Sequence, residues 1–273
     1  MPIKFYAPLW GNTLSFKEFC KNVAEAGYDG VEMDLPLEAS AKREVLDTLK
    51  EYDLELIAQY YQSFEPEPAA NLEAYRRYLE HLLKAAPVAV NCQTGKDFFT
   101  FEENAPHFSL ARRLSEASGI PITHETHRGK CLYAAPVAAS YFEKIPDLRI
   151  CLDISHWCNV HESLLEDQKE AVNLALSRTD HIHSRVGFAE GPQVNDPRAP
   201  EWSDALQAHL GWWDRVVHRH RKAGTVLRIT TEFGPFPYMP SLAYTQMPAG
   251  NQWEINVYML HLLKNRYQDT SLG

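Results

Sequence analysis

The chain has 273 residues, of which 45% are hydrophobic and 23% are charged, and this composition is that of an ordinary globular protein. The length suits one domain over residues 1–273, because single α/β barrels typically have about 250 residues. The formal net charge of −9 at pH 7 argues against a nucleic-acid partner, since phosphate backbones are bound by clustered Lys and Arg side chains.

Short apolar and β-branched runs alternate along the chain with longer segments of helical periodicity. Phe16, Phe19 and Val23 form one apolar stripe, and the segment from Leu206 to Val217 carries another. Such spacing places apolar side chains on one face of a helix, where they pack against a sheet. The eight expected strands are, in chain order, Ile3–Pro8, Gly30–Met33, Leu54–Tyr60, Val88–Asn91, Ile122–Glu125, Ile150–Ile154, His181–Val186 and Val226–Glu232.

Eight strand-then-helix units predict a parallel sheet. Closure into a barrel is the natural arrangement for eight strands, and an open doubly wound sheet is the alternative. A Gly-x-Gly-x-x-Gly loop after the first strand would favour the open dinucleotide-binding sheet, but the segment from Leu9 to Thr13 lacks that motif. We therefore predict an α/β protein with a single (β/α)8 TIM barrel.

The cysteines and the apolar runs indicate the compartment. The chain has five cysteines, an odd number, and no Cys-x-x-Cys pair, so we expect a reducing environment without a disulfide framework. The first ten residues lack the order of a signal peptide. No apolar run approaches the roughly 18–20 residues needed to span a bilayer. These features predict a soluble cytoplasmic protein with no membrane partner.

The ends of the last four expected strands carry carboxylates and imidazoles, whereas the first four end in polar and aromatic residues. In a barrel the active site lies at the carboxyl ends of the strands. Glu125, Asp153, His183 and Glu232 lie at or near four consecutive strand ends, which would bring them close together. A single Glu or His at such a position is more often structural, and the coincidence of four groups favours a shared site.

Three crowded carboxylates repel one another, and a cation among them removes this cost. Three oxygen ligands and one imidazole suit a divalent ion such as Mn²⁺, Co²⁺ or Mg²⁺, with Zn²⁺ as an alternative. The residues therefore predict one divalent metal ion.

Five segments carry a resemblance to a known family. They are Ala26–Glu32, His124–His127, Leu152–His156, Asp180–His183 and Thr230–Gly234. Together they resemble the xylose-isomerase-like barrel superfamily, which includes ketose 3-epimerases, hydroxypyruvate isomerases, inosose dehydratases and endonuclease IV. The resemblance covers nearly the whole chain. Its motifs are specific for the superfamily but not for one substrate.

The resemblance implies that Glu125, Asp153, His183 and Glu232 bind one divalent metal. It implies an isomerase or epimerase for a small sugar or polyol, in which Glu125 and Glu232 transfer protons through an ene-diolate. It leaves a homo-oligomer open. The expected substrate contacts are His156, Arg185, Arg198, His127 and Trp10.

Three alternatives remain. A keto-polyol dehydratase of the inosose type would use the same residues. Endonuclease IV requires a three-zinc cluster with histidines from strands three and four, and the segments 59–61 and 91–93 contain none. The third alternative is a barrel that binds sugar without catalysis.

The long loop from Gly187 to Pro200 is expected to act as a lid or specificity loop. His124 and His181 are expected to be core or supporting residues.

Overall fold

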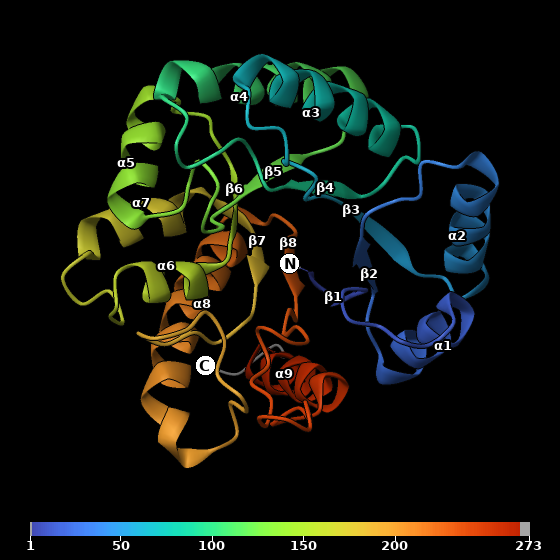
Figure 1. The fold of residues 1–273 in the computed structure, drawn as a ribbon, viewed down its shortest axis with the longest axis vertical. Helices are drawn as coiled ribbons and strands as arrows, with labels where there is room; N and C mark the ends of the chain where they lie inside the picture. Colours follow the sequence, from blue (N-terminus) through green and yellow to red (C-terminus); the bar gives the residue numbers. More distant parts are fainter. Residues whose placement is uncertain (1, 268–273) are drawn as a thin grey trace.

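The computed structural model describes residues 2–267, and residue 1 and residues 268–273 of the predicted domain lie outside this range. Eight parallel strands pair in chain order, and the last pairs with the first, so the sheet closes into a barrel surrounded by helices (Figure 1). The predicted (β/α)8 barrel is confirmed. The strands are β1 (Ile3–Pro8), β2 (Gly30–Met33), β3 (Glu55–Tyr60), β4 (Ala89–Cys92), β5 (Ile122–Glu125), β6 (Ile150–Leu152), β7 (Thr179–His183) and β8 (Leu227–Thr230).

The helices begin and end at local sequence signals. In α1, Ser15 and Glu18 form a capping box, and the helix ends at Gly27 with φ of 87°, a left-handed conformation that favours glycine. In α4, Thr100 and Glu103 form the same motif. The helices are α1 (Phe16–Ala26), α2 (Ala39–Glu51), α3 (Pro68–Leu83), α4 (Phe101–Ser118), α5 (Ala135–Lys144), α6 (Ile154–Val160), α7 (Lys169–Arg178), α8 (Ser203–Ala223) and α9 (Gln252–Tyr267), with a 3₁₀ turn at Pro200–Trp202.

Five of the predicted strands have different bounds in the structure. β3 begins one residue later than predicted, β4 is shifted by one residue at both ends, and β8 is shorter at both ends. β6 stops at Leu152 because Asp153 caps α6, with its carboxylate accepting a hydrogen bond from the Ser155 amide. β7 stops at His183, and Val186 belongs instead to the following loop, where its carbonyl accepts a hydrogen bond from Val194 at 2.9 Å.

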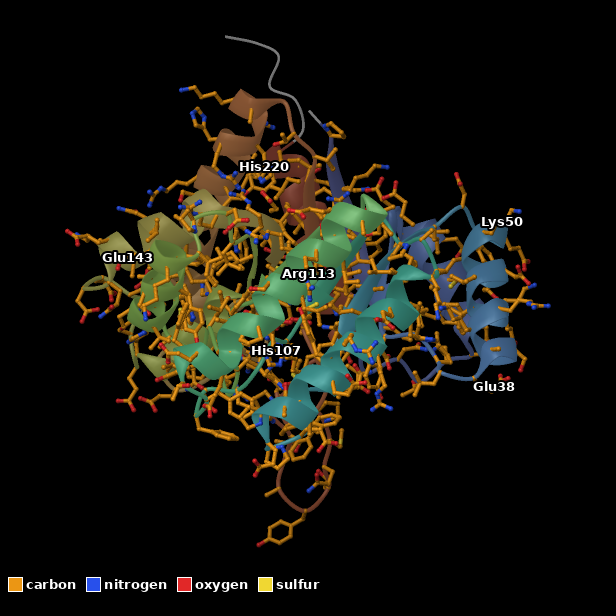
Figure 2. All side chains as sticks on the ribbon, turned by 90° about the horizontal axis from the view of Figure 1, so that it is seen from above. Glu38, Lys50, His107, Arg113, Glu143 and His220 are labelled. Atoms are coloured by element: carbon orange, nitrogen blue, oxygen red, sulfur yellow. The ribbon has the colours of Figure 1, made fainter. Side chains whose placement is uncertain are left out.

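The main apolar core lies between the barrel and the helices. Phe19 and Trp213, from the predicted stripes, are buried in it. Charged side chains such as Lys50, Arg113 and Glu143 extend from the outer helix faces away from the barrel (Figure 2). The five cysteines are buried and unpaired. Within residues 2–267, no helix has the length and apolar character required to cross a bilayer.

Candidate metal centre

The structure brings the four predicted ligands together at the carboxyl end of the barrel. Glu125 ends β5 and His183 ends β7, while Asp153 directly follows β6 and Glu232 lies two residues after β8. All four are buried. Each offers one ligand atom, and these four atoms lie within 4.8 Å of one another. The expected convergence of four consecutive strand ends is therefore present in the barrel.

Three of the converging residues have buried polar atoms without a hydrogen-bond partner. These atoms are Glu125 Oε1, His183 Nδ1 and Glu232 Oε2. His183 Nδ1 and Glu232 Oε2 lie 2.7 Å apart, yet their geometry is not that of a hydrogen bond. Two ligand atoms at about 2.1 Å from one ion lie roughly 3 Å apart when their bonds are perpendicular. The chemistry and spacing of these atoms fit a divalent cation.

One buried guanidinium lies beside the cluster. Arg185 contacts Asp153 Oδ2, and its Nη2 lies 3.5 Å from Glu232 Oε2. Arg185 and His183 offset only part of the repulsion among the three carboxylates. Burial raises the pKa of the Glu125 carboxyl well above its usual range; His183 opposes this effect, and Glu232 and Asp153 add to it. Ionisation of all three carboxylates is therefore costly in this centre, and a divalent cation would remove that cost.

Two buried residues beneath the cluster were missed by the sequence analysis. Glu32 of β2 lies with both carboxylate oxygens 3.1 Å from His183 Nε2. Asn91 of β4 donates to Glu32 and to Glu125. Burial alone would raise the pKa of Glu32, but His183, His181 and the Thr230 hydroxyl hold it at about 2. The available signal was an acidic residue inside an otherwise apolar strand.

A cavity of about 390 Å³ opens at the barrel mouth beside the cluster. Trp10, His127 and Arg185, three of the predicted substrate contacts, line it. The complete lining is Leu9, Trp10, Met33, Asp34, Gln59, Tyr61, Gln93, Glu125, His127, Arg185, Glu232 and Tyr238. This mixture of carboxylates, amides and aromatic rings is typical of a small-molecule pocket with a few convergent polar groups.

Two predicted substrate contacts lie outside the cavity lining. His156 is fully buried behind it, with Nε2 at 2.9 Å from Arg185 Nη2 and its ring 4.0 Å from that of His127. Arg198 is partly exposed and forms an ion pair with Asp196 at 2.7 Å. His156 therefore adjoins the site through its neighbours, and Arg198 is not brought to it.

Tyr238, in the loop after β8, is a lining residue that the sequence analysis missed. Its hydroxyl lies 3.3 Å from His127 Nε2, and its ring packs edge-on against Trp10 with centroids 4.9 Å apart. The Arg185 guanidinium lies 4.7 Å from the centre of the same ring. Tyr238 thus forms an aromatic wall next to the converging residues. Its position within a long irregular loop gave no local signal.

The long loop after β7 is packed against the barrel over part of its length. Gln193 is buried, and its side-chain amide donates to the Gly234 carbonyl and accepts from the Gly234 amide. Phe188 and Gly191 form an antiparallel bridge inside the loop. These bonds join the loops that follow β7 and β8. A lid or specificity role for this loop stays a prediction.

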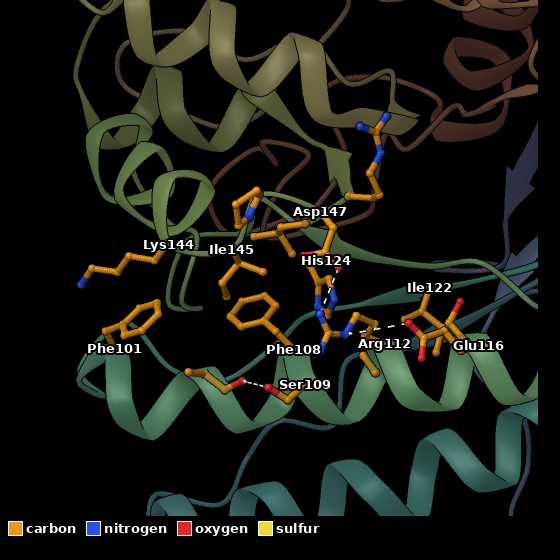
Figure 3. Close-up of a pocket in the computed structure, with 16 residues that line it drawn as sticks. Phe101, Phe108, Ser109, Arg112, Glu116, Ile122, His124, Lys144, Ile145 and Asp147 are labelled. Carbon is orange, nitrogen blue, oxygen red and sulfur yellow. Dashed lines mark hydrogen bonds and ion pairs between the residues drawn. The ribbon is translucent and has the colours of Figure 1, made fainter.

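A second hollow, of about 440 Å³, lies outside the barrel beside α4 and α5 (Figure 3). Two of its charged groups pair with each other, Arg112 with Asp147 at 3.3 Å. His124 borders it, but the Nδ1 atom of that ring faces the Thr94 hydroxyl at 2.7 Å. None of the four converging residues lines this hollow. The candidate site is therefore the cavity at the barrel mouth.

A closed (β/α)8 barrel with three carboxylates and an imidazole converging at its carboxyl end defines a barrel protein with a candidate metal centre. The family described as the xylose isomerase-like TIM barrel matches residues 20–220, and the chain belongs to this family. The resemblance noted in the sequence is thereby confirmed.

Solved structures with the same fold include enzymes of different activities. The 3-keto-D-glucoside 4-epimerase of E. coli has a TM-score of 0.62 at 14% identity, covering 97% of this chain and 100% of that one. The probable 3-DHS dehydratase of Bacillus anthracis has a TM-score of 0.59 at 15% identity, covering 96% of this chain and 99% of that one. Endonuclease IV of Thermus thermophilus has a TM-score of 0.57 at 12% identity, covering 97% of this chain and 98% of that one. At these identities the likeness is one of fold. A search of curated proteins finds no match to the chain.

Proposed function

We propose that the chain is a divalent-metal-dependent isomerase or epimerase of a small sugar-like polyol. The observation that carries the proposal is the convergence of Glu125, Asp153, His183 and Glu232, with three unpartnered buried atoms among them. The cavity beside them is lined by amides, carboxylates and aromatic rings. Such a lining suits a compound that carries hydroxyl groups on an apolar skeleton.

Glu125 and Glu232 are the proposed acid and base, because both belong to the converging group and both line the cavity. A divalent cation, when bound, would supply Lewis-acid polarisation of a substrate carbonyl. One glutamate takes the proton from the carbon next to the carbonyl, which leaves an ene-diolate, and the other returns a proton. Return to the opposite face of that carbon inverts a stereocentre. Return to the former carbonyl carbon, together with transfer of the neighbouring hydroxyl proton to the former carbonyl oxygen, moves the carbonyl.

The surrounding residues position the substrate and limit the access of water. Arg185 is buried against Asp153, so its guanidinium is held at a fixed place on the cavity wall. Trp10 and Tyr238 pack edge-on and form the aromatic side of the cavity. Removal of water strengthens each electrostatic contact inside such a site. These contacts support proton transfer to and from carbon.

A keto-polyol dehydratase is the second candidate, and the fold likeness to the probable 3-DHS dehydratase favours it over other chemistries. It would use the same glutamates but expel a hydroxyl group after proton removal. A nuclease of the endonuclease IV kind is disfavoured because the ends of β3 and β4 hold no histidine, and because the net charge is −9.

The test combines metal content with proton exchange. Elemental mass spectrometry of the purified protein should find about one equivalent of Mn, Co, Mg or Zn, and the Glu232→Gln variant should lose this metal.

Ketoses, hydroxypyruvate and inososes are then incubated with the protein in D₂O, and the reaction is followed by NMR. Deuterium in a recovered or rearranged substrate supports the isomerase, and an unsaturated product identifies a dehydratase. No metal after reconstitution would indicate a non-catalytic sugar-binding barrel, and three zinc equivalents would indicate a nuclease.

A further inference from the structure

Two buried side chains lie directly beneath the candidate metal centre and belong to the opposite half of the barrel. Glu32 comes from β2 and Asn91 from β4, and neither lines the cavity. Glu32 is 3% exposed and Asn91 is fully buried. The Asn91 Nδ2 atom donates to Glu32 Oε1 at 3.0 Å. We call these two residues the Glu32–Asn91 pair.

His183 and Glu125 each have two atoms that could bind a metal ion. The Glu32–Asn91 pair contacts one of these two atoms on each residue. His183 Nε2 lies 3.1 Å from both oxygens of Glu32, while His183 Nδ1 has no hydrogen-bond partner. Asn91 donates to Glu125 Oε2 at 3.2 Å, while Glu125 Oε1 has no partner. The two unpartnered atoms, 3.8 Å apart, are the ones that face each other in the cluster. The contacts with Glu32 and Asn91 therefore determine which atom of His183 and which atom of Glu125 remains free to bind a metal ion.

The selection has a simple chemical basis at His183. A neutral imidazole has one N–H and one lone pair, and a carboxylate can only accept a hydrogen bond. In the neutral form of His183 that a metal ion requires, Glu32 would therefore hold the hydrogen on Nε2 and leave the lone pair on Nδ1, the arrangement of carboxylate–histidine–metal triads. Asn91 Nδ2 also lies 3.3 Å from Nε2, but its two hydrogens are directed to the carboxylates of Glu32 and Glu125.

Glu32 is itself held in place from β7 and β8. The Thr230 hydroxyl donates to Glu32 Oε2 at 2.5 Å, and His181 Nε2 lies 3.4 Å from the same oxygen. The carboxylate is thus surrounded by donors from three other strands and has little freedom to rotate. A rigid acceptor of this kind fixes the ring of His183 as well as its tautomer.

We propose that the Glu32–Asn91 pair positions the metal ligands, with Glu32 selecting Nδ1 of His183 and Asn91 selecting Oε1 of Glu125. The inference rests on the proposed metal-dependent function. If the inference is correct, substitutions in the pair change metal affinity and coordination geometry. Substitutions of residues that only fill the barrel interior would not have this effect.

The test is a Co²⁺ titration of metal-stripped protein, followed by visible absorption, which reports coordination geometry. Glu32→Gln keeps the size of the side chain but turns an NH₂ group toward donors, so Co²⁺ affinity should fall about 10- to 100-fold with a changed spectrum. Asn91→Ala, which removes the donor to Glu125, should weaken binding by a smaller factor. Glu55→Gln is the matched control, because that carboxylate accepts a hydrogen bond from the Tyr6 hydroxyl within the same sheet and should leave Co²⁺ binding unchanged.

The outcomes separate the positioning role from the metal centre itself. If wild-type protein binds Co²⁺ and both folded variants bind it with the same affinity and spectrum, the positioning role is wrong and the metal centre stands. If wild-type protein binds no Co²⁺, the proposed metal centre is wrong, and the inference falls with it. Circular dichroism of each metal-free variant confirms that a lost affinity is not a lost fold. Should Glu32→Gln fail to fold, Asn91→Ala alone decides the question.

Discussion

The two halves of the barrel contribute differently to the site. The second half, β5 to β8, supplies all four converging residues, one from each strand end. The first half, β1 to β4, supplies none of these four. It supplies instead much of the cavity wall and the pair beneath the centre, namely Leu9, Trp10, Met33, Asp34, Gln59, Tyr61, Gln93, Glu32 and Asn91.

The difference follows from the spacing of strands in a closed sheet. Neighbouring strands lie about 4.8 Å apart, so single side chains at adjacent strand ends meet without long loops. Residues of the opposite half face them across the barrel and reach the same space from the other side. The proposed reacting groups lie on the second half, and much of the cavity wall lies on the first half, which implies different kinetic effects. Changes at the four converging residues should lower kcat, and changes at the first-half residues that line the cavity should raise KM.

The largest expected effect is on turnover in Glu232→Gln. Loss of a proposed proton-transfer group should lower kcat by about 10²- to 10⁴-fold. The free energy of unfolding of the metal-free protein should not fall, because the substitution removes one of several crowded carboxylates. Steady-state kinetics and urea unfolding measure the two quantities. Glu143→Gln, on the outer face of α5, is the exposed control (Figure 2). Retained turnover together with a large drop in melting temperature would refute the role of Glu232.

The next largest effect is expected on stability in Arg185→Gln. Removal of a buried cation that contacts Asp153 leaves carboxylates unpaired, which costs about 3–5 kcal/mol of unfolding free energy. Added Mn²⁺ should restore part of this loss, since it supplies positive charge at the same cluster. The measurement is urea unfolding with and without Mn²⁺. Arg198→Gln breaks a more exposed pair and should cost about 1 kcal/mol or less. Equal stability of both variants would contradict the argument.

The sequence was sufficient to predict the barrel and the convergence of four residues at the ends of its second-half strands. Strand and helix periodicities differ locally, so the eight units could be predicted from short windows. Glu125, Asp153, His183 and Glu232 each lie in or next to a predicted strand end, and their positions need no knowledge of distant contacts. The error at β6 arose because capping by Asp153 ends the strand despite the apolar Ile154 that follows.

The first half of the site could not be predicted in the same way. Glu32 acts on His183, which lies 151 residues later, and no sequence spacing encodes that contact. Tyr238 reaches the cavity from an irregular loop, whose path depends on packing against Trp10. His156 was expected to contact the substrate, but the structure places it behind Arg185 and His127. Whether a buried polar residue lines a cavity or supports its wall depends on tertiary packing.

A smaller effect is expected on the pH dependence of the unfolding free energy. The residue concerned is His209, whose hydrogen bonds connect the loop after β7 to α8. Its Nδ1 faces the Ala205 carbonyl, and its Nε2 accepts the Gly187 amide, so the ring is neutral. Burial lowers the pKa of His209 to about 4. The unfolded chain therefore takes up the proton first, and stability present above about pH 6.5 is lost as the pH falls toward 4, by roughly 3 kcal/mol.

His209→Gln removes this titrating group and is compared with wild type by urea unfolding at pH 7 and pH 4.5. The fall in unfolding free energy between the two pH values should be smaller in the variant by up to that amount. His124 and His107 are also buried with lowered pKa values, so part of the acid sensitivity remains. An identical pH dependence in both proteins would show that His209 does not contribute.

The smallest expected effect is on KM in Gln93→Ala, a substitution in the first half of the barrel. Gln93 lines the cavity and belongs to the loop after β4. One hydrogen bond between neutral groups is worth about 1 kcal/mol, so KM should rise roughly five-fold while kcat changes little. Gln207→Ala, exposed on α8, is the matched control. A fall in kcat at unchanged KM would place Gln93 at the reacting centre, and the division of labour between the two halves would then no longer hold.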